Sequence, residues 1–235
     1  MTTLYGVLLK TLVTRGRLLA MGALGFVAIL LSILVRGSAP ADRTDAAYRL
    51  LDAYGLSLLI PVVALVFASA VLGDLAEDGT LVYLWLRPVA RWKLATAAAL
   101  AALTVSIPVA VVPVVIGATI SGVGVRFVLG ALCAALLSAA AYTAVFCGIG
   151  LRVRRALAWG LAYLVIWEQA VARIAKGAAR LSISVTTRTL GARIAGHNPL
   201  PRNAMSLPIA LFVPFAAIAI AVFVTTRSLD RGEIA

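Results

Sequence analysis

The chain has 235 residues, of which 63% are hydrophobic and only 13% are charged. Soluble domains have an apolar share of roughly 45–50%, so this composition excludes an ordinary soluble domain and predicts an all-α polytopic membrane protein. The net charge of +12 does not indicate nucleic-acid binding, because Lys and Arg lie mostly between and beside the apolar runs, as charges at a membrane surface do. We expect one integral membrane domain over residues 1–235 and no nucleic-acid partner.

Residues 1–17 are predicted to form an amphipathic helix. Polar and small residues recur there at spacings of three and four, and leucines fill the other side. A basic amphipathic segment of this kind suits the membrane interface. A simple extension of the first membrane span into the cytoplasm is the alternative.

The apolar runs predict six transmembrane helices, since a span needs about 17–25 residues. The expected spans cover residues 18–35, 53–72, 94–120, 127–151, 156–172 and 206–226. A polar loop is expected over 36–52, between the first two spans. Bends are expected where prolines interrupt the helical hydrogen bonds, at Pro61, Pro108 and Pro113.

A turn rich in glycine is expected at 121–124, between the third and fourth spans. The fourth span carries small residues at every fourth position, and such stripes let membrane helices approach one another closely. One stripe comprises Gly130, Ala134 and Ser138, and the other comprises Ala140, Ala144 and Gly148.

The distribution of Lys and Arg does not by itself decide the orientation of the chain in the membrane. If all six spans cross and both termini are cytoplasmic, Lys and Arg are shared almost evenly between the two sides. If the 156–172 run instead dips into the membrane and returns, most of the basic residues become cytoplasmic and the C-terminus lies outside. By charge alone the second topology is the better of the two, and six crossings are preferred only because of the family resemblance given below.

The sequence carries no catalytic constellation. It contains no HExxH, GxSxG or GxxxxGK[ST] motif, so hydrolytic chemistry and P-loop nucleotide binding are not expected of this chain. The single histidine, His197, lies in a Gly-His-Asn-Pro turn and is expected to be a loop residue. The chain is therefore predicted to be no enzyme and to bind no cofactor or metal by itself.

Glu168 is the only acidic residue within an apolar run, and ionisable groups inside a membrane are functional candidates by default. It stands between Trp167 and Gln169, and Arg173 follows one turn further on. One interpretation is a structural ion pair at the outer interface. The other is a polar lining of a substrate path, formed by Trp167, Glu168 and Gln169.

The segment 73–93 is a charged connection that contains a short apolar block. Thr80 is placed to cap a helix that begins at Leu81. Arg87 follows the block, where a cation complements the helix dipole, and Pro88 ends it. A helix that is apolar on nearly every side favours burial in a groove of another protein. Insertion of this helix back into the lipid interface is the alternative.

The same segment resembles the E-x-G-T-L…L…R-P-V-x-R pattern of the permease subunits of type-2 ABC exporters, a family of drug, antibiotic and polysaccharide exporters. The resemblance implies that an ATP-binding subunit docks on a set of residues in this segment. They are Glu77, Asp78, Gly79, Thr80, Leu81, Leu84, Trp85, Arg87, Pro88 and Arg91.

In that family two six-span permeases pair, and each carries a coupling helix after span 2 on which a separate ATP-binding subunit docks. The resemblance thus implies six crossings, an interfacial N-terminal helix and short outer helices between spans 5 and 6. It also implies two copies of an ABC ATP-binding subunit, which would hold ATP and Mg. Further expectations are a second permease subunit, in a homodimer or heterodimer, and contact with the lipids of the bacterial cytoplasmic (inner) membrane.

The expected function is that of a permease subunit that moves an apolar or amphipathic substrate outward, using ATP hydrolysis by the partner. Both termini would be cytoplasmic. A polytopic membrane scaffold or channel component without ATP coupling is the alternative.

Overall fold

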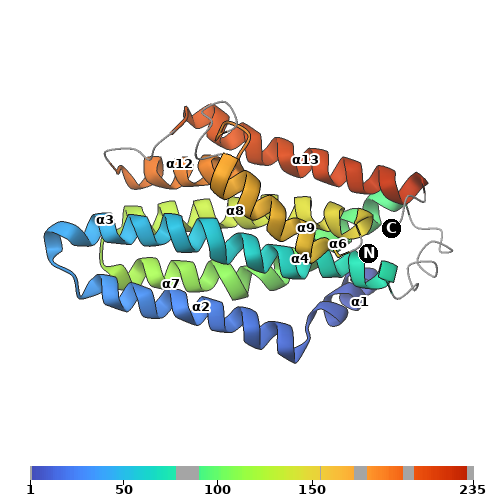
Figure 1. The fold of residues 1–235 in the computed structure, drawn as a ribbon, viewed down its shortest axis with the longest axis horizontal. Helices are drawn as coiled ribbons and strands as arrows, with labels where there is room; N and C mark the ends of the chain where they lie inside the picture. Colours follow the sequence, from blue (N-terminus) through green and yellow to red (C-terminus); the bar gives the residue numbers. More distant parts are fainter. Residues whose placement is uncertain (1, 78–89, 154, 172–178, 198–203, 232–235) are drawn as a thin grey trace.

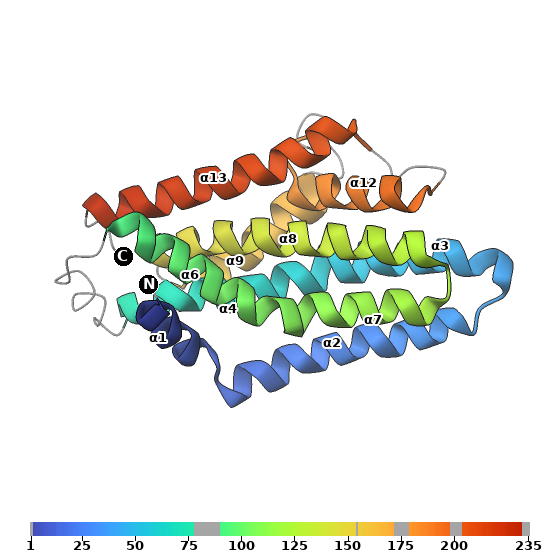
Figure 2. The same cartoon turned by 180° about the vertical axis from the view of Figure 1, so that it is seen from behind.

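The computed structural model describes residues 2–77, 90–153, 155–171, 179–197 and 204–231. This part of the chain is 90% helical and contains no strand. The long helices run roughly side by side along one axis and form an elongated bundle (Figures 1 and 2). The expected all-α class is confirmed.

The N-terminal helix α1 (Thr2–Leu12) is separate from α2 (Arg15–Arg36). The backbone leaves the helical conformation at Thr14, with φ −102° and ψ 140°, and α1 turns away from the line of α2 (Figure 1). Leu8 and Leu12 are buried, and the Tyr5 hydroxyl donates a hydrogen bond of 2.9 Å to Thr104 Oγ1. Because α1 packs across the bundle, the alternative of a simple extension of the first span is wrong.

The expected polar loop over 36–52 is mostly helical, so that prediction was wrong outside a short turn. The chain runs without interruption through α3 (Pro40–Leu50), the π-helical η1 (Leu51–Leu59) and α4 (Ile60–Glu77). Pro40 starts the helix, where its missing N–H costs nothing. Ala47 is buried, whereas Asp42, Asp45 and Arg49 are exposed. The apolar stretch Asp42–Leu75 has 34 residues, about 51 Å at ~1.5 Å per residue, longer than a ~30 Å hydrocarbon core.

The third expected span is confirmed as a helix with a π-helical segment in its middle. It comprises α6 (Arg91–Ser106), η2 (Ile107–Val111) and α7 (Val112–Ser121). Pro108 stands at the start of η2 and Pro113 at the start of α7, so the wider turns fall where proline removes hydrogen bonds. Gly122 ends α7 with φ 70°, and Gly124 precedes α8 (Val125–Arg152) with φ 132°. The expected glycine turn is therefore confirmed.

The last third of the chain contains α9 (Ala156–Ala162), the π-helical η3 (Tyr163–Val171), α12 (Ile183–Ala195) and α13 (Leu207–Arg231). Helix α13 continues past the expected end of the sixth span. By length and composition, five described stretches can cross a membrane: Arg15–Arg36, Asp42–Leu75, Arg91–Ser121, Val125–Arg152 and Leu207–Leu229. The expected span at 156–172 is helical over its described residues, in α9 and η3. Its apolar part, Ala156–Glu168, is shorter than the 18 residues set for a membrane-spanning candidate.

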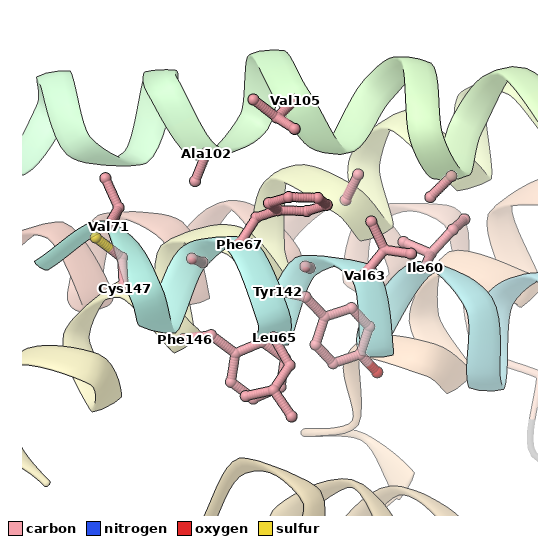
Figure 3. Close-up of a cluster of buried hydrophobic side chains, with 14 of the residues drawn as sticks. Ile60, Val63, Leu65, Phe67, Val71, Ala102, Val105, Tyr142, Phe146 and Cys147 are labelled. Atoms are coloured by element: carbon pink, nitrogen blue, oxygen red, sulfur yellow. The ribbon is translucent and has the colours of Figure 1, made fainter. Parts of the chain in front are cut away.

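Helices α4 and α8 form the centre of the bundle, and α6 packs on them. Phe67 points from α4 toward Ala102 and Val105 of α6, while Leu65 lies near Phe146 of α8 (Figure 3). Lipid is as apolar as these side chains, so their contribution comes mainly from close packing rather than from removal of water. The alanines of α6 allow its backbone to lie close to α4.

Helices α2 and α13 lie on opposite outer edges of the bundle (Figures 1 and 2). Both expose large apolar side chains, among them Phe26 and Leu34 on α2 and Phe212 and Phe223 on α13. Exposed surfaces of this composition are unfavourable in water and suit the hydrocarbon of a bilayer or a second membrane subunit.

Candidate functional site

The predicted docking stretch joins α4 to α6. Helix α4 ends at Glu77, and α6 begins at Arg91 after Ala90. The side chain of Glu77 lies outside the described residues, as do Asp78, Gly79, Thr80, Leu81, Leu84, Trp85, Arg87 and Pro88. The helix expected over 81–86 and its docking role therefore stay predictions.

The two ends of the docking stretch lie at one end of the bundle. Helix α1, the α8–α9 turn and the last turn of α13 lie at the same end, whereas the α2–α3 and α7–α8 turns lie at the opposite end (Figures 1 and 2). The beginning of α1 and the end of α13 thus share a side. This arrangement disagrees with the alternative topology, in which the 156–172 run turns back and the C-terminus lies across from the N-terminus.

An ion pair ties two elements together beside the docking stretch. Arg17 Nη2 of α2 lies 2.9 Å from Asp74 Oδ2 of α4, and the two side chains are 31% and 44% exposed. A pair with this exposure contributes only about 0–1 kcal/mol. Asp74, which lies in the charged connection 73–93, is thus engaged with the start of α2.

The backbones of α4 and α8 touch one turn before α4 ends. A Cβ placed on Gly73 would lie 3.0 Å from the carbonyl oxygen of Gly150. A Cβ placed on Gly150 would overlap the carbonyl oxygen of Ser69 and lie 2.7 Å from its Cα. Neither helix has a side chain at this point that could yield, so α4 and α8 cannot move closer together here.

The carboxyl group of Glu168 lies in a buried polar cluster at the start of α12. The residue is 1% exposed. The Ser182 and Ser184 hydroxyls donate to Oε2 at 2.6 and 2.7 Å, and the Ser184 backbone N–H lies 3.4 Å from the same oxygen. The Ile183 N–H and the Tyr163 hydroxyl donate to Oε1 at 3.1 and 3.3 Å.

These contacts make Glu168 an anchor between η3 and the N-terminus of α12. The first N–H groups of a helix have no partner within the helix, and a negative group there also complements the helix dipole. Ser182 is the N-cap of α12 and accepts a hydrogen bond from the Val185 N–H. The described partners account for the burial of Glu168 without a substrate.

The other two residues of the expected substrate path are less informative. Trp167 is half-buried, and the side chain of Gln169 lies outside the described part of the chain, as does Arg173, the expected ion-pair partner of Glu168. The lining of a substrate path by Trp167, Glu168 and Gln169 stays a prediction.

A second polar cluster lies at the end of the bundle that carries the α2–α3 and α7–α8 turns. Arg188 Nη1 of α12 donates to both carboxylate oxygens of Asp52 in η1, at 3.1 and 3.0 Å. His197 stacks on Tyr48 of α3 with ring centroids 3.7 Å apart. His197 is a loop residue as expected, since it follows the C-cap Gly196 of α12, but it is held against another helix.

Sequence reasoning missed this second cluster. Asp52 and Arg188 are far apart in the chain, and Tyr48 and Asp52 were assigned to a polar loop. A usable signal existed in the spacing of Tyr48 and Asp52, which are four residues apart and therefore share a helical face. Among the described residues, no group of three His, Cys, Asp or Glu side chains is placed to hold a metal ion.

A bundle with five helices of membrane-spanning length and lipid-suited outer faces is a multi-pass membrane protein. A family model described as ABC-2 family transporter protein matches residues 9–167. The chain belongs to this family, and it is a permease subunit of an ABC transporter. The match includes the docking stretch and ends one residue before Glu168.

No curated protein matches the sequence significantly. The family is a membrane component of transporters rather than a catalytic domain, and it works with an ATP-binding partner subunit that carries the ATPase activity.

Proposed function

We propose that the chain exports an apolar or amphipathic substrate, driven by ATP hydrolysis in two copies of a separate ATP-binding subunit. ATP and Mg would be held by those subunits. A second permease subunit, identical or related, would complete the translocation path. The observation that carries the proposal is the family match together with the tight α4–α8 contact one turn from the docking stretch.

The proposed topology has six crossings within one domain over residues 1–235. The fifth crossing would be residues 156–172, of which the structure describes α9 and η3, and α12 would be an outer helix between spans 5 and 6. Both termini would be cytoplasmic, α1 would lie at the interface, and the membrane would be the bacterial inner membrane. The position of α1, the docking stretch and the end of α13 at one end of the bundle supports this assignment.

The proposed mechanism uses the docking stretch as a lever. Closure of the ATP-binding subunits would push residues 77–91 and hence the end of α4. The contact of Gly73 and Ser69 with Gly150 would pass this movement to α8. Helix α8 also contacts α12 and α13, so the shift would reach the opposite end of the bundle.

The variant L84D/W85D is expected to lose the ATP-binding subunit on purification of the complex. The two substitutions remove apolar side chains at the expected centre of the docking surface and replace them with charges. Such central side chains typically contribute about 2 kcal/mol or more each, so the amount of copurified ATP-binding subunit should fall by about tenfold or more. The measurement is the ratio of ATP-binding subunit to permease after affinity purification, with transport followed in the same membranes.

The matched control is R227E, which reverses a charge on exposed Arg227 near the end of α13 and leaves residues 77–91 intact. It should retain the subunit. Normal copurification and transport by L84D/W85D would contradict the docking proposal. Absence of any ATP-binding subunit from the wild-type preparation would instead favour a scaffold or channel without ATP coupling.

A further inference from the structure

A cavity of about 170 Å³ lies between η1 and α12. Its walls include the ion pair Asp52–Arg188, and the Tyr48–His197 stack lines it as well. At about 30 Å³ per water molecule, it has room for several waters or for one group of the size of a phosphate. The cavity is built by residues that the docking mechanism does not use.

The cavity has an excess of positive charge. Arg188 is 12% exposed on its side chain, and Asp52 is 37% exposed. The Nε of Arg188 is buried and has no hydrogen-bond partner within the described part of the chain. Arg49 also lines the cavity, so one carboxylate stands opposite two guanidinium groups. A buried N–H without a partner is costly, so the Arg188 guanidinium carries a donor that Asp52 does not satisfy.

A larger groove of about 500 Å³ shares Tyr48 and His197 with this cavity. It is lined by a third arginine, Arg126, and by the apolar side chains of Val125 and Phe127. The Tyr48 ring lies edge-on to Phe127, with ring centroids 4.8 Å apart. The two spaces together thus offer three arginines and a partly apolar wall.

We infer that this composite site binds an amphiphile that carries a single oxyanion group, a phosphate or a carboxylate, on an apolar body. The head group lies against Arg188 and Arg49, because guanidinium groups form strong charge-assisted hydrogen bonds with oxyanions. The apolar body lies along Val125 and Phe127. The inference is independent of ATP coupling, since it concerns binding to the permease alone.

The test is titration of the purified full-length chain, in the neutral detergent dodecyl maltoside, with dodecyl phosphate as the probe. R188Q is expected to weaken binding by about tenfold or more, the usual size of one lost charge-assisted hydrogen bond. D52N removes the carboxylate that competes for Arg188, so it is expected to tighten binding. Opposite effects of the two variants are the signature of an anion site.

Two controls separate binding from folding. R180Q removes an exposed arginine that lines neither space and should leave binding unchanged. The double variant D52N/R188Q replaces the ion pair by two amides that can bond to each other, and it should bind as weakly as R188Q while remaining monodisperse. Equal weakening by D52N and R188Q would overturn the inference, because it would make the pair a structural link only.

Inorganic phosphate distinguishes a free anion from an amphiphile. The affinity of inorganic phosphate, measured by competition with dodecyl phosphate, should be about tenfold or more lower than that of dodecyl phosphate. Inorganic phosphate makes no contact with Val125 and Phe127, whereas each buried CH₂ of the alkyl chain contributes ~0.8 kcal/mol. Equal affinity for the two probes would overturn the amphiphile assignment.

Discussion

Replacing Glu168 by alanine is expected to lower the thermal midpoint of the purified protein by about 10 °C. The estimate follows from the ~3–5 kcal/mol typical for removal of one partner from a buried charged network and from a shift of ~2–4 °C per kcal/mol for a chain of this size. The loss should be larger than for any exposed carboxylate of the chain, since Glu168 is 1% exposed.

The physical reason is the number of donors that the alanine variant leaves behind. The hydroxyls of Ser182 and Ser184 and the N–H groups of Ile183 and Ser184 point at the carboxyl group, together with the Tyr163 hydroxyl. Each buried donor without a partner costs about 1–3 kcal/mol. The hydroxyls can turn toward other acceptors, but the backbone N–H groups at the start of α12 cannot.

Glutamine at position 168 is expected to lie between glutamate and alanine. Its amide oxygen can accept from Ile183 and Tyr163, while its NH₂ group can donate to the hydroxyls of Ser182 and Ser184. The Ser184 N–H would lose its acceptor. We expect a loss of about 1.5–3 kcal/mol for E168Q, the typical effect of one charge-assisted hydrogen bond.

A double-mutant cycle tests whether Glu168 acts through the start of α12. S182A removes both a hydroxyl donor and the N-cap, so it should cost about 1–2 kcal/mol alone. Because the residues are in contact, E168A/S182A should cost less than the sum of the single variants by about 1 kcal/mol. Additive effects would contradict the anchor role.

Unfolding can be followed through the protein's own thiols. Cys147 is buried in α8, and Cys133 is exposed, so a thiol-reactive dye in a C133S background reports exposure of Cys147 on heating. The control D45A removes an exposed carboxylate of α3 and should change the free energy of unfolding by less than about 0.5 kcal/mol. A thermal midpoint for E168A equal to that of D45A would contradict the prediction.

The sequence predicts those parts of the fold that rest on local patterns. Helices α2 and α8 begin and end close to the expected bounds because apolar runs and flanking polar residues fix them. The stripe of Gly130, Ala134 and Ser138 predicts a close helix contact, and in the structure Gly130 faces the backbone of Gly191 in α12. Helix α3 was missed because its polar composition resembles that of a loop, whereas its helix is set by continuity with η1 and α4.

The candidate site is predicted less fully, because its interacting residues are far apart in the sequence. Nothing local to Glu168 identifies Ser182 and Ser184 as its partners, because the intervening segment must first fold back. Asp52 and Arg188 meet only when η1 and α12 pack together. The single glycines Gly73 and Gly150 carry no repeat that would mark them as the closest contact of α4 and α8.

Replacing Gly150 by alanine is expected to destabilise the protein by about 3 kcal/mol, the upper end of the ~1–3 kcal/mol typical for overpacked sites. The new methyl group would overlap the carbonyl oxygen of Ser69 and lie 2.7 Å from its Cα. Backbone atoms cannot rotate away as a side chain can, so α4 and α8 must separate. The thermal midpoint should fall by about 6–12 °C.

Alanine substitutions at two other glycines of the same chain serve as comparisons for G150A. At Gly148 the nearest atom to a new Cβ is Thr225 Oγ1, at 2.9 Å, which is the end of a side chain. At Gly22, in the middle of α2, nothing lies within 4 Å. G148A should therefore cost less than G150A, while G22A should be neutral or raise stability by about 0.5–1 kcal/mol, because alanine favours the helix.

The order of stability of the three alanine variants distinguishes the effect of close packing from that of helix propensity, because the chemical change is the same at each position. Propensity alone would make all three variants equal or more stable. Close packing of α4 on α8 requires G150A to be the least stable of the three. Under the proposed lever mechanism, G150A should also be the least able to couple ATP hydrolysis to transport. A G150A variant as stable as G22A would contradict the close backbone contact of α4 and α8 at this position.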